Sequence, residues 1–211
     1  MANLRVESRT YRLTGLTPIL GSLPAIKDIR TRIVTSKAID EEATKEETAS
    51  SFDVDGRGLT VFARDKQGHL CVMGYQVKGF FKAALYALRG QYNIAAYKSK
   101  VDLLVFVEPR FVPIKHEDAY VFYEDTILER PLRSSGPQGE RVAIASSEQI
   151  DDPWNVTVEI SLLPNSTSKS AKGESLTWDI IEAALDYGAY HGLGQWRNAD
   201  YGRFIWERIE D

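Results

Sequence analysis

Alternating apolar and polar positions near the start of the chain predict its first strand. Residues 4–13 alternate Leu, Val, Tyr and Leu with charged side chains, as in a strand with one buried face. Turn residues follow at 17–22, and Pro24 is placed to open a helix, with three isoleucines at helical spacing behind it. The stretch 35–58 is polar and acidic, so we expect a mobile surface loop there.

The middle of the chain predicts a hairpin, a helix and a buried strand. Two short apolar runs, 59–64 and 69–73, flank four turn residues and predict a β-hairpin. Apolar positions recur at helical spacing over 77–89, which predicts an amphipathic helix ending at Gly90. Residues 101–107 form an almost continuous apolar run, and we therefore expect a strand in the centre of the sheet.

Strand patterns then dominate until a final helix and strand. Short strands are predicted at 111–114, 120–123, 127–132 and 141–145. A longer strand is predicted at 154–163, with valine and isoleucine on one face. A polar linker then leads to a helix over 176–190 and a last strand over 204–209.

This order of elements predicts an α+β fold. The pattern fits a ferredoxin-like or RRM-like antiparallel sheet with helices on one face. At this length we expect a single domain, 1–211, in which 35–58 is a mobile acidic loop and 108–150 is an inserted β-hairpin region.

Composition and charge narrow the possible functions. The net charge of −4 excludes a strongly basic protein that coats DNA, although a local basic groove remains compatible with it. Cys71 is the single cysteine, so no disulfide can form within the chain. The sequence shows neither an apolar signal region nor an apolar run long enough to cross a bilayer, and we expect a cytoplasmic protein with no membrane partner.

The stretch 191–204 is the strongest candidate for a functional site. It combines three glycines, two aromatic rings and two guanidinium groups: Gly192, Gly194, Trp196, Arg197, Tyr201, Gly202 and Arg203. Glycine has no Cβ and allows positive φ, so another chain can approach its backbone. Arginine pairs with phosphate and aromatic rings stack on bases, which favours a nucleic-acid strand. The alternative is a helix-to-strand turn in which Trp196 and Tyr201 are core residues.

The same stretch resembles a known family. The order of segments here resembles the C-terminal glycine-rich loop of the RAMP superfamily. A helix is followed by Gly-x-Gly, by a short basic segment and by Gly202-Arg203-Phe204 at the start of a last strand. These are RRM-like, ferredoxin-like proteins of CRISPR systems that bind or cut guide RNA. Residues 13–21 resemble the family's first strand and loop, and residues 77–85 resemble its second helix start. Phage proteins resemble the same C-terminal pattern, so the resemblance implies a CRISPR-associated protein or a phage-encoded relative.

Further basic residues extend the candidate surface. Lys78 and Lys82 lie on the predicted helix 77–89 and would add contacts to a nucleic-acid backbone. Arg130, Arg133 and Arg141 surround Gly-Pro-Gln-Gly at the predicted tip of the inserted hairpin. This tip is either a basic finger that contacts nucleic acid or a neighbouring subunit, or a solvated hairpin with no partner.

Motifs for cofactor or metal chemistry are missing from the sequence. There is no phosphate-binding glycine loop, no H-E-x-x-H and no cysteine pair, so we expect neither a cofactor nor a metal. Metal-independent RNA cleavage would need a general base near the 2′-hydroxyl group. His191, Tyr190 and His116 are weak candidates for that role, and no catalytic residue is favoured.

Three hypotheses remain. The favoured one is a protein that binds RNA or another single strand without cleaving it, and that self-associates or joins a complex as subunits of the resembled family do. The second is a metal-independent endoribonuclease on the same fold. The third is a phage-encoded module that engages a host protein complex, which the acidic net charge favours.

Overall fold

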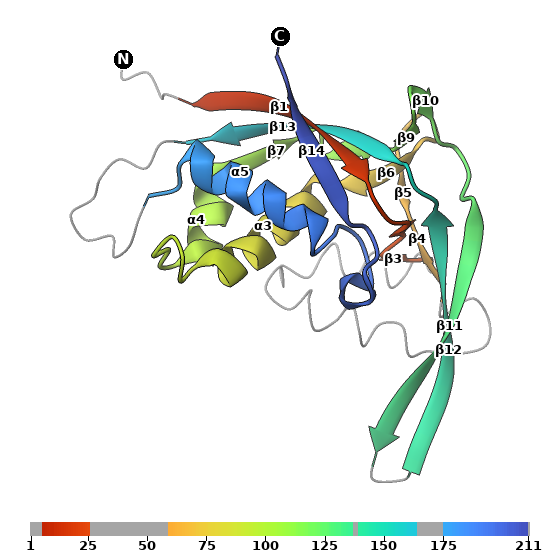
Figure 1. Ribbon diagram of the computed structural model, residues 1–211. Helices are drawn as coiled ribbons and strands as arrows, with labels where there is room; N and C mark the ends of the chain where they lie inside the picture. Colours follow the sequence, from red (N-terminus) through yellow and green to blue (C-terminus); the bar gives the residue numbers. More distant parts are fainter. Residues whose placement is uncertain (1–5, 26–58, 137–138, 164–174, 211) are drawn as a thin grey trace.

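The computed structural model describes residues 6–25, 59–136, 139–163 and 175–210. The described chain is a mixed α+β structure whose sheets are mostly antiparallel. In Figure 1 the helices pack beneath one sheet, and a long two-stranded ribbon extends away from the body of the molecule. None of the helices in the described ranges is both long enough and apolar enough to span a membrane.

The main sheet brings together strands from both ends of the chain. Its four principal strands run in the order β14–β1–β13–β7, and every neighbouring pair is antiparallel. These strands are β1 (Glu7–Gly15), β7 (Val105–Glu108), β13 (Asn155–Leu162) and β14 (Phe204–Ile209). The short strands β9 (Lys115–His116) and β10 (Ala119–Tyr120) continue the sheet beyond the start of β13.

Period-two alternation explains why these segments form strands with one buried face. In β13, Val156, Val158 and Ile160 are fully buried, while Thr157 and Glu159 between them are exposed. The buried face packs on the helices, and Figure 1 shows all three on the same side of the sheet. They are α3 (Gly74–Leu88), α4 (Tyr97–Leu104) and α5 (Trp178–Asp186).

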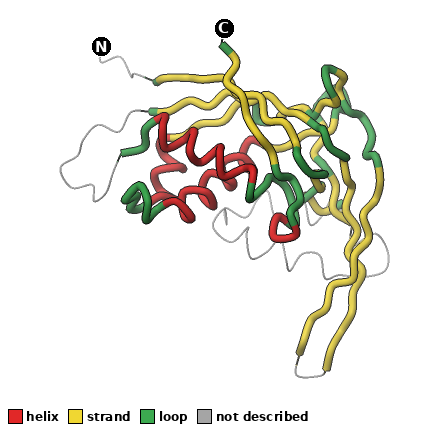
Figure 2. Tube along the Cα trace, in the orientation of Figure 1, coloured by secondary structure: helices red, strands yellow, loops and turns green. Residues whose placement is uncertain are grey.

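Two smaller sheets complete the fold. One contains β2 (Ile19–Leu20), β3 (Leu23–Pro24), β4 (Leu59–Val61), β11 (Thr126–Gly136) and β12 (Gly139–Ile150). The other contains β5 (Ala63–Arg64), β6 (Leu70–Met73) and β8 (Phe111–Pro113). Strands β11 and β12 pair along their whole length and form the projecting ribbon, which Figure 2 shows as two long adjacent strands.

Three predictions about secondary structure are wrong. The strand predicted at 120–123 is one of them, because only Tyr120 of that segment lies in a strand, β10. Residues 101–107 were expected to form a central strand, but α4 occupies the first part and β7 pairs only with β13 in the described chain. Val101 and Val105 are fully buried whereas Leu103 and Phe106 are exposed, because the apolar run crosses a helix-to-strand junction. Pro24 does not open a helix: it ends β3, which pairs with β4. The predicted helix beyond Pro24 and the predicted loop 35–58 lie outside the described residues.

The predicted hairpin over 59–73 is divided between two sheets. Its second half is correct, since β5 and β6 pair with each other, although residues 65–69 make the turn one residue longer than predicted. The segment before them, β4, instead pairs with β3 and lies parallel to β12. This parallel pairing aligns Ser147 with Thr60 and sets up a buried polar cluster.

Candidate functional site

The glycine-rich loop closes on itself. It follows one turn of 3₁₀ helix, Tyr187–Ala189, at the end of α5 and leads into β14. The Leu193 amide donates to the Gly202 carbonyl oxygen at 2.9 Å, and the Gly202 amide donates to the Pro18 carbonyl oxygen at 2.8 Å. Gly194 and Gly202 have φ of +80° and +72°, which favours glycine at both positions.

The loop's own backbone uses the space that the missing side chains leave. A Cβ at Gly192 would overlap the backbone of Gly202, and a Cβ at Gly202 would overlap the Leu193 carbonyl group. A Cβ at Gly194 would lie 2.7 Å from the Leu20 carbonyl oxygen. The protein's own backbone thus explains why glycine stands at all three positions, and contact between these glycines and a nucleic-acid strand stays a prediction.

Arg203 connects the loop to the end of the last helix. Its Nε donates to the Ala189 carbonyl oxygen at 2.7 Å, where the final carbonyl groups of a helix lack partners within the helix. The Arg203 amide donates to Thr17 Oγ1 at 2.9 Å, and that hydroxyl donates to the Asp200 carbonyl oxygen at 2.6 Å. Arg203 thus has a structural contact that the sequence did not predict, and phosphate binding by it stays a prediction.

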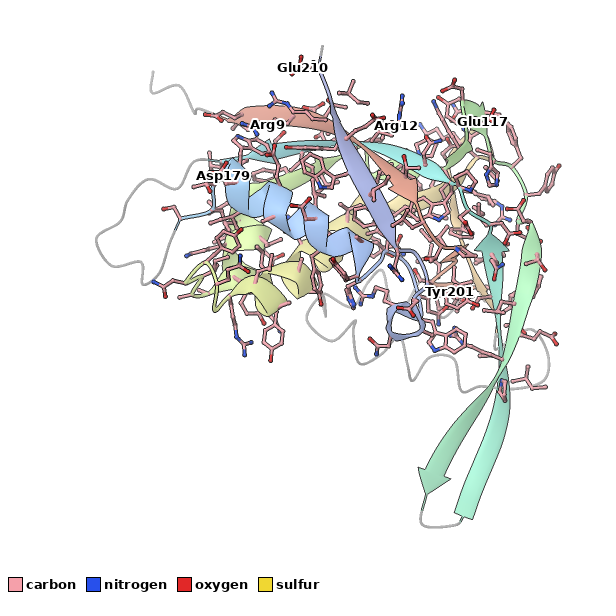
Figure 3. The ribbon with its side chains drawn as sticks, viewed as in Figure 1. Arg9, Arg12, Glu117, Asp179, Tyr201 and Glu210 are labelled. Carbon is pink, nitrogen blue, oxygen red and sulfur yellow. The ribbon has the colours of Figure 1, made fainter. Side chains whose placement is uncertain are left out.

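Trp196 lies in an aromatic and cationic stack. Tyr201 stacks on it with ring centroids 5.3 Å apart and planes inclined by 14°. The Arg130 guanidinium carbon lies 4.3 Å from the Trp196 ring centroid, in cation–π geometry. Trp196 is 38% exposed and has φ of +57°, a conformation that L-residues other than glycine, asparagine and aspartate seldom adopt. Both rings brace the loop, and Figure 3 shows Tyr201 beside the ribbon.

Arg130, which belongs to the predicted hairpin finger, reaches this stack. It lies on β11 opposite Ala145 of β12, and only 6% of the residue is exposed. Its Nε and Nη1 have no hydrogen-bond partner among the described residues. Burial lowers the pKa of Arg130, and nearby Tyr201 opposes this effect. A guanidinium stays charged in proteins, so the structure holds a buried cation that lacks a carboxylate partner in the described ranges.

The third guanidinium nitrogen of Arg130 belongs to a buried polar cluster. Gln195 accepts from Arg130 Nη2 at 3.2 Å when its amide is oriented to satisfy all of its neighbours. In that orientation its nitrogen donates to Thr60 Oγ1 at 2.7 Å, to Ser147 Oγ at 3.2 Å and to the Gly21 carbonyl oxygen at 3.0 Å. Sequence reasoning missed this cluster, because its members come from separate segments that only the β4–β12 pairing brings together.

The two predicted lysines lie elsewhere. Lys82 Nζ forms an ion pair with Asp102 Oδ1 at 2.9 Å, and Lys78 Nζ donates to the Asp102 carbonyl oxygen at 3.2 Å. Burial lowers the pKa of Lys78. Both lysines therefore join α3 to α4, and Figure 1 shows α4 at the end of the helical layer away from the glycine loop.

Arg133 and Arg141 lie further out on the ribbon. Their backbones pair with Val142 and Ser134 respectively, beyond Arg130 toward the tip. Their side chains fall outside the described residues. A basic finger built from these two arginines therefore stays a prediction.

The weak catalytic candidates do not converge. His116 Nε2 lies 3.1 Å from Asp125 Oδ2, and its Nδ1 lies 3.0 Å from the Pro153 carbonyl oxygen, at the base of the ribbon. His191 packs on Tyr187 at the end of α5, and burial, assisted by the charge of Arg197, lowers its pKa. Tyr190 is 76% exposed. In the described ranges, His, Cys, Asp and Glu side chains form no group of three or more suited to a metal ion.

Comparison with known proteins finds a weak similarity to a solved structure. No protein-family model matches the chain, and no curated protein matches it. A chain of the cryo-EM structure of the Type III-B Cmr-beta bound to cognate target RNA aligns with a TM-score of 0.42 and 10% sequence identity. The alignment covers 98% of this chain and 60% of that chain, so this chain spans well under two thirds of its length. At this score and identity, the likeness identifies neither a family nor an activity.

Proposed function

We propose that this protein binds single-stranded nucleic acid, with RNA as the first candidate, and does not cleave it. The binding surface is the junction between the β11–β12 ribbon and the glycine loop. The observation that carries the proposal is Arg130, a buried guanidinium that contacts a partly exposed tryptophan. Two of its nitrogens have no hydrogen-bond partner in the part of the chain that the structure describes.

An unpaired buried cation has a long electrostatic reach. Charges in a protein interior are screened much less than exposed charges, so the field of Arg130 extends to the surface around Trp196. Arg197 and Arg203 add two positive charges in the loop, against the single carboxylate of Asp200. A protein with a net charge of −4 thus gains a local positive surface suited to a phosphate chain.

The aromatic side chains give this surface a preference for unpaired bases. Trp196 is held at fixed geometry by Arg130 and Tyr201, so little side-chain entropy remains to be lost when a base contacts its exposed part. Stacking of bases on aromatic rings contributes about 1–3 kcal/mol per base and requires strand separation. This favours a single strand over a duplex.

The strand order supports a ferredoxin-like core for this protein. Such a core contains two interleaved β-α-β units, and the order β14–β1–β13–β7 has this interleaved arrangement. Here α3 and α4 lie between β1 and β7 in the sequence, and α5 lies between β13 and β14. On this assignment the glycine loop connects the last helix to an edge strand, and the ribbon is an insertion before the third core strand.

Fluorescence anisotropy with a short labelled RNA, the matching DNA and an RNA duplex tests the proposal. We expect the RNA single strand to bind most tightly. Arg197→Ala should weaken binding several-fold and reduce the salt slope by about 0.7, the amount expected for one lost phosphate contact on a single strand. Arg12→Ala is the matched control, since it removes an exposed arginine that pairs with Glu207 on the main sheet.

Two results would overturn this function. If neither RNA nor DNA single strands bind at low salt, the site has another role. If Arg197→Ala and Arg12→Ala weaken binding equally, the interaction is non-specific. Incubation of RNA with the protein in EDTA is the test for turnover: cleavage that disappears in His191→Ala would replace binding alone with endoribonuclease activity.

A further inference from the structure

A second surface, remote from the glycine loop, has aromatic rings set among carboxylates. Its rings are Tyr120, Phe122 and Tyr123, together with His69, and we call this group the aromatic ridge. Tyr120 and Phe122 are each close to half exposed, and Tyr123 is 80% exposed. In Figure 3 Glu117, which precedes the ridge at the β9–β10 turn, lies far from Tyr201 of the loop.

The ridge is rigid. Val121 is buried between Tyr120 and Phe122, its amide donates to the Ile114 carbonyl oxygen at 3.0 Å, and its carbonyl oxygen accepts from the Leu70 amide at 2.7 Å. The His69 ring stacks on Tyr120 with centroids 4.3 Å apart and contacts Phe122 at 4.8 Å. Its Nδ1 lies 2.7 Å from Asp65 Oδ2, which fixes the ring orientation.

A large, preorganised aromatic surface of this kind is typical of a binding site. Tyrosine and phenylalanine are enriched in protein interfaces, and a preorganised side chain loses little entropy when a partner binds. Isolated apolar residues on a surface are common, but three neighbours on one pinned segment form a patch.

The charges around the ridge select the partner. Residues 111–129 contain five carboxylates and one lysine, and Arg110 and Arg130 flank this segment. Asp125 pairs with His116, and Glu124 lies 3.9 Å from Arg64. Glu117 and Asp118, at the β9–β10 turn directly before Tyr120, are exposed and form no ion pair among the described residues. A phosphate chain would be repelled here, whereas arginine or lysine gains carboxylate contacts and cation–π contacts together.

The protein's own lysine illustrates this recognition. Lys115 Nζ lies 4.5 Å from the Tyr120 ring centroid, so one ring of the ridge already binds a cation. Phe122 and Tyr123 have no cation over their rings among the described residues. We propose that the aromatic ridge docks a basic, arginine- or lysine-rich segment of a partner protein. This surface is separate from the nucleic-acid site, so the two proposals stand independently.

Titration with a labelled peptide of alternating arginine and glycine tests the ridge. We expect saturable binding that weakens at least tenfold in the double variant Phe122→Ala/Tyr123→Ala, which leaves every charge in place. The control is Tyr86→Ala, which removes an exposed tyrosine from α3 on another part of the surface. Asp118→Lys should weaken the peptide further, because it reverses a charge beside the rings.

The alternatives give distinct results. Equal affinity of the peptide for the wild type and for Phe122→Ala/Tyr123→Ala would show attraction to net charge alone and would overturn the proposal. Loss of labelled RNA binding in that double variant would assign the ridge to nucleic acid instead. Thermal melting of each variant confirms folding, and because both substituted rings are exposed we expect little change in melting temperature.

Discussion

Replacing Arg130 by methionine should make this protein more stable and a weaker binder of nucleic acid. Transfer of an ion from water to a protein interior costs several kcal/mol. In Arg130 this is offset by the bond to Gln195, about 1.5–3 kcal/mol, and by the contact with Trp196, about 0.5–2 kcal/mol. Two guanidinium nitrogens remain unpaired among the described residues, and no ion pair of Arg130 is present there.

Methionine is unbranched, flexible and uncharged, so it fills most of the space along the arginine side chain without the desolvation cost. We expect Arg130→Met to raise the free energy of unfolding by about 1–3 kcal/mol, in line with replacements of buried ions by apolar residues. For a chain of this size that corresponds to about 2–4 °C in melting temperature per kcal/mol. Urea titration and thermal melting measure the change.

Two further variants make the interpretation secure. Arg130→Lys keeps the charge but loses the planar donor group, and should not stabilise the protein. Arg12→Met removes an exposed arginine and should change the unfolding free energy by less than about 1 kcal/mol. A loss of stability in Arg130→Met would refute the reasoning, since it would mean that the guanidinium finds its acceptors within the protein.

Three other perturbations give separate tests. Gly202→Ala should lower the free energy of unfolding by at least about 2 kcal/mol, because it places a side chain at positive φ against the loop backbone, whereas Gly79→Ala in the open middle of α3 should raise it by about 0.5–1 kcal/mol; both are measured by urea titration. Burial raises the pKa of the Cys71 thiol to about 11. The stability that comes from keeping this thiol protonated is therefore present below about pH 9 and is lost as pH rises to about 11. Cys71→Ala should flatten this alkaline decline in melting temperature. Burial and Arg197 lower the pKa of His191. The stability that comes from keeping this imidazole neutral is therefore present above the ordinary histidine pKa and is lost as pH falls through the lowered pKa. Melting curves of the wild type and His191→Gln at acidic pH measure this loss, and identical curves would contradict the lowered pKa.

Local patterns of apolar residues predicted several elements correctly, even where the partner strand is distant in the sequence, as for β14 and β1. The last strand, 204–209, has the predicted bounds, and the helix predicted at 77–89 is α3. The prediction for residues 101–107 was wrong because a short apolar run has no period that distinguishes a buried helix end from a strand. The prediction that Pro24 opens a helix was wrong because Pro24 pairs with β4, which is distant in the sequence.

The candidate site was harder to predict than the fold. The sequence identified Trp196 and Tyr201 as a possible stacking pair, and they do contact each other. It placed Arg130 in a flexible finger, yet this arginine is buried at the base of the ribbon. Burial of a charged residue opposes its usual preference, so only the side-chain contacts of Arg130 with Gln195 and Trp196 in the folded structure reveal it.

The strand order also determines when this protein can fold during synthesis. Strand β1 leaves the ribosome well before its two partners, β13 and β14, because both lie far behind it in the sequence. Contacts between such distant segments form slowly, because the entropy cost of closing a long loop arises before the contacts can stabilise the chain. The β11–β12 ribbon, in contrast, joins adjacent residues across one turn. We therefore expect the ribbon to form before β1 has paired. The Tyr11 and Leu13 face of β1 then stays exposed to chaperones until β13 and β14 have been synthesised.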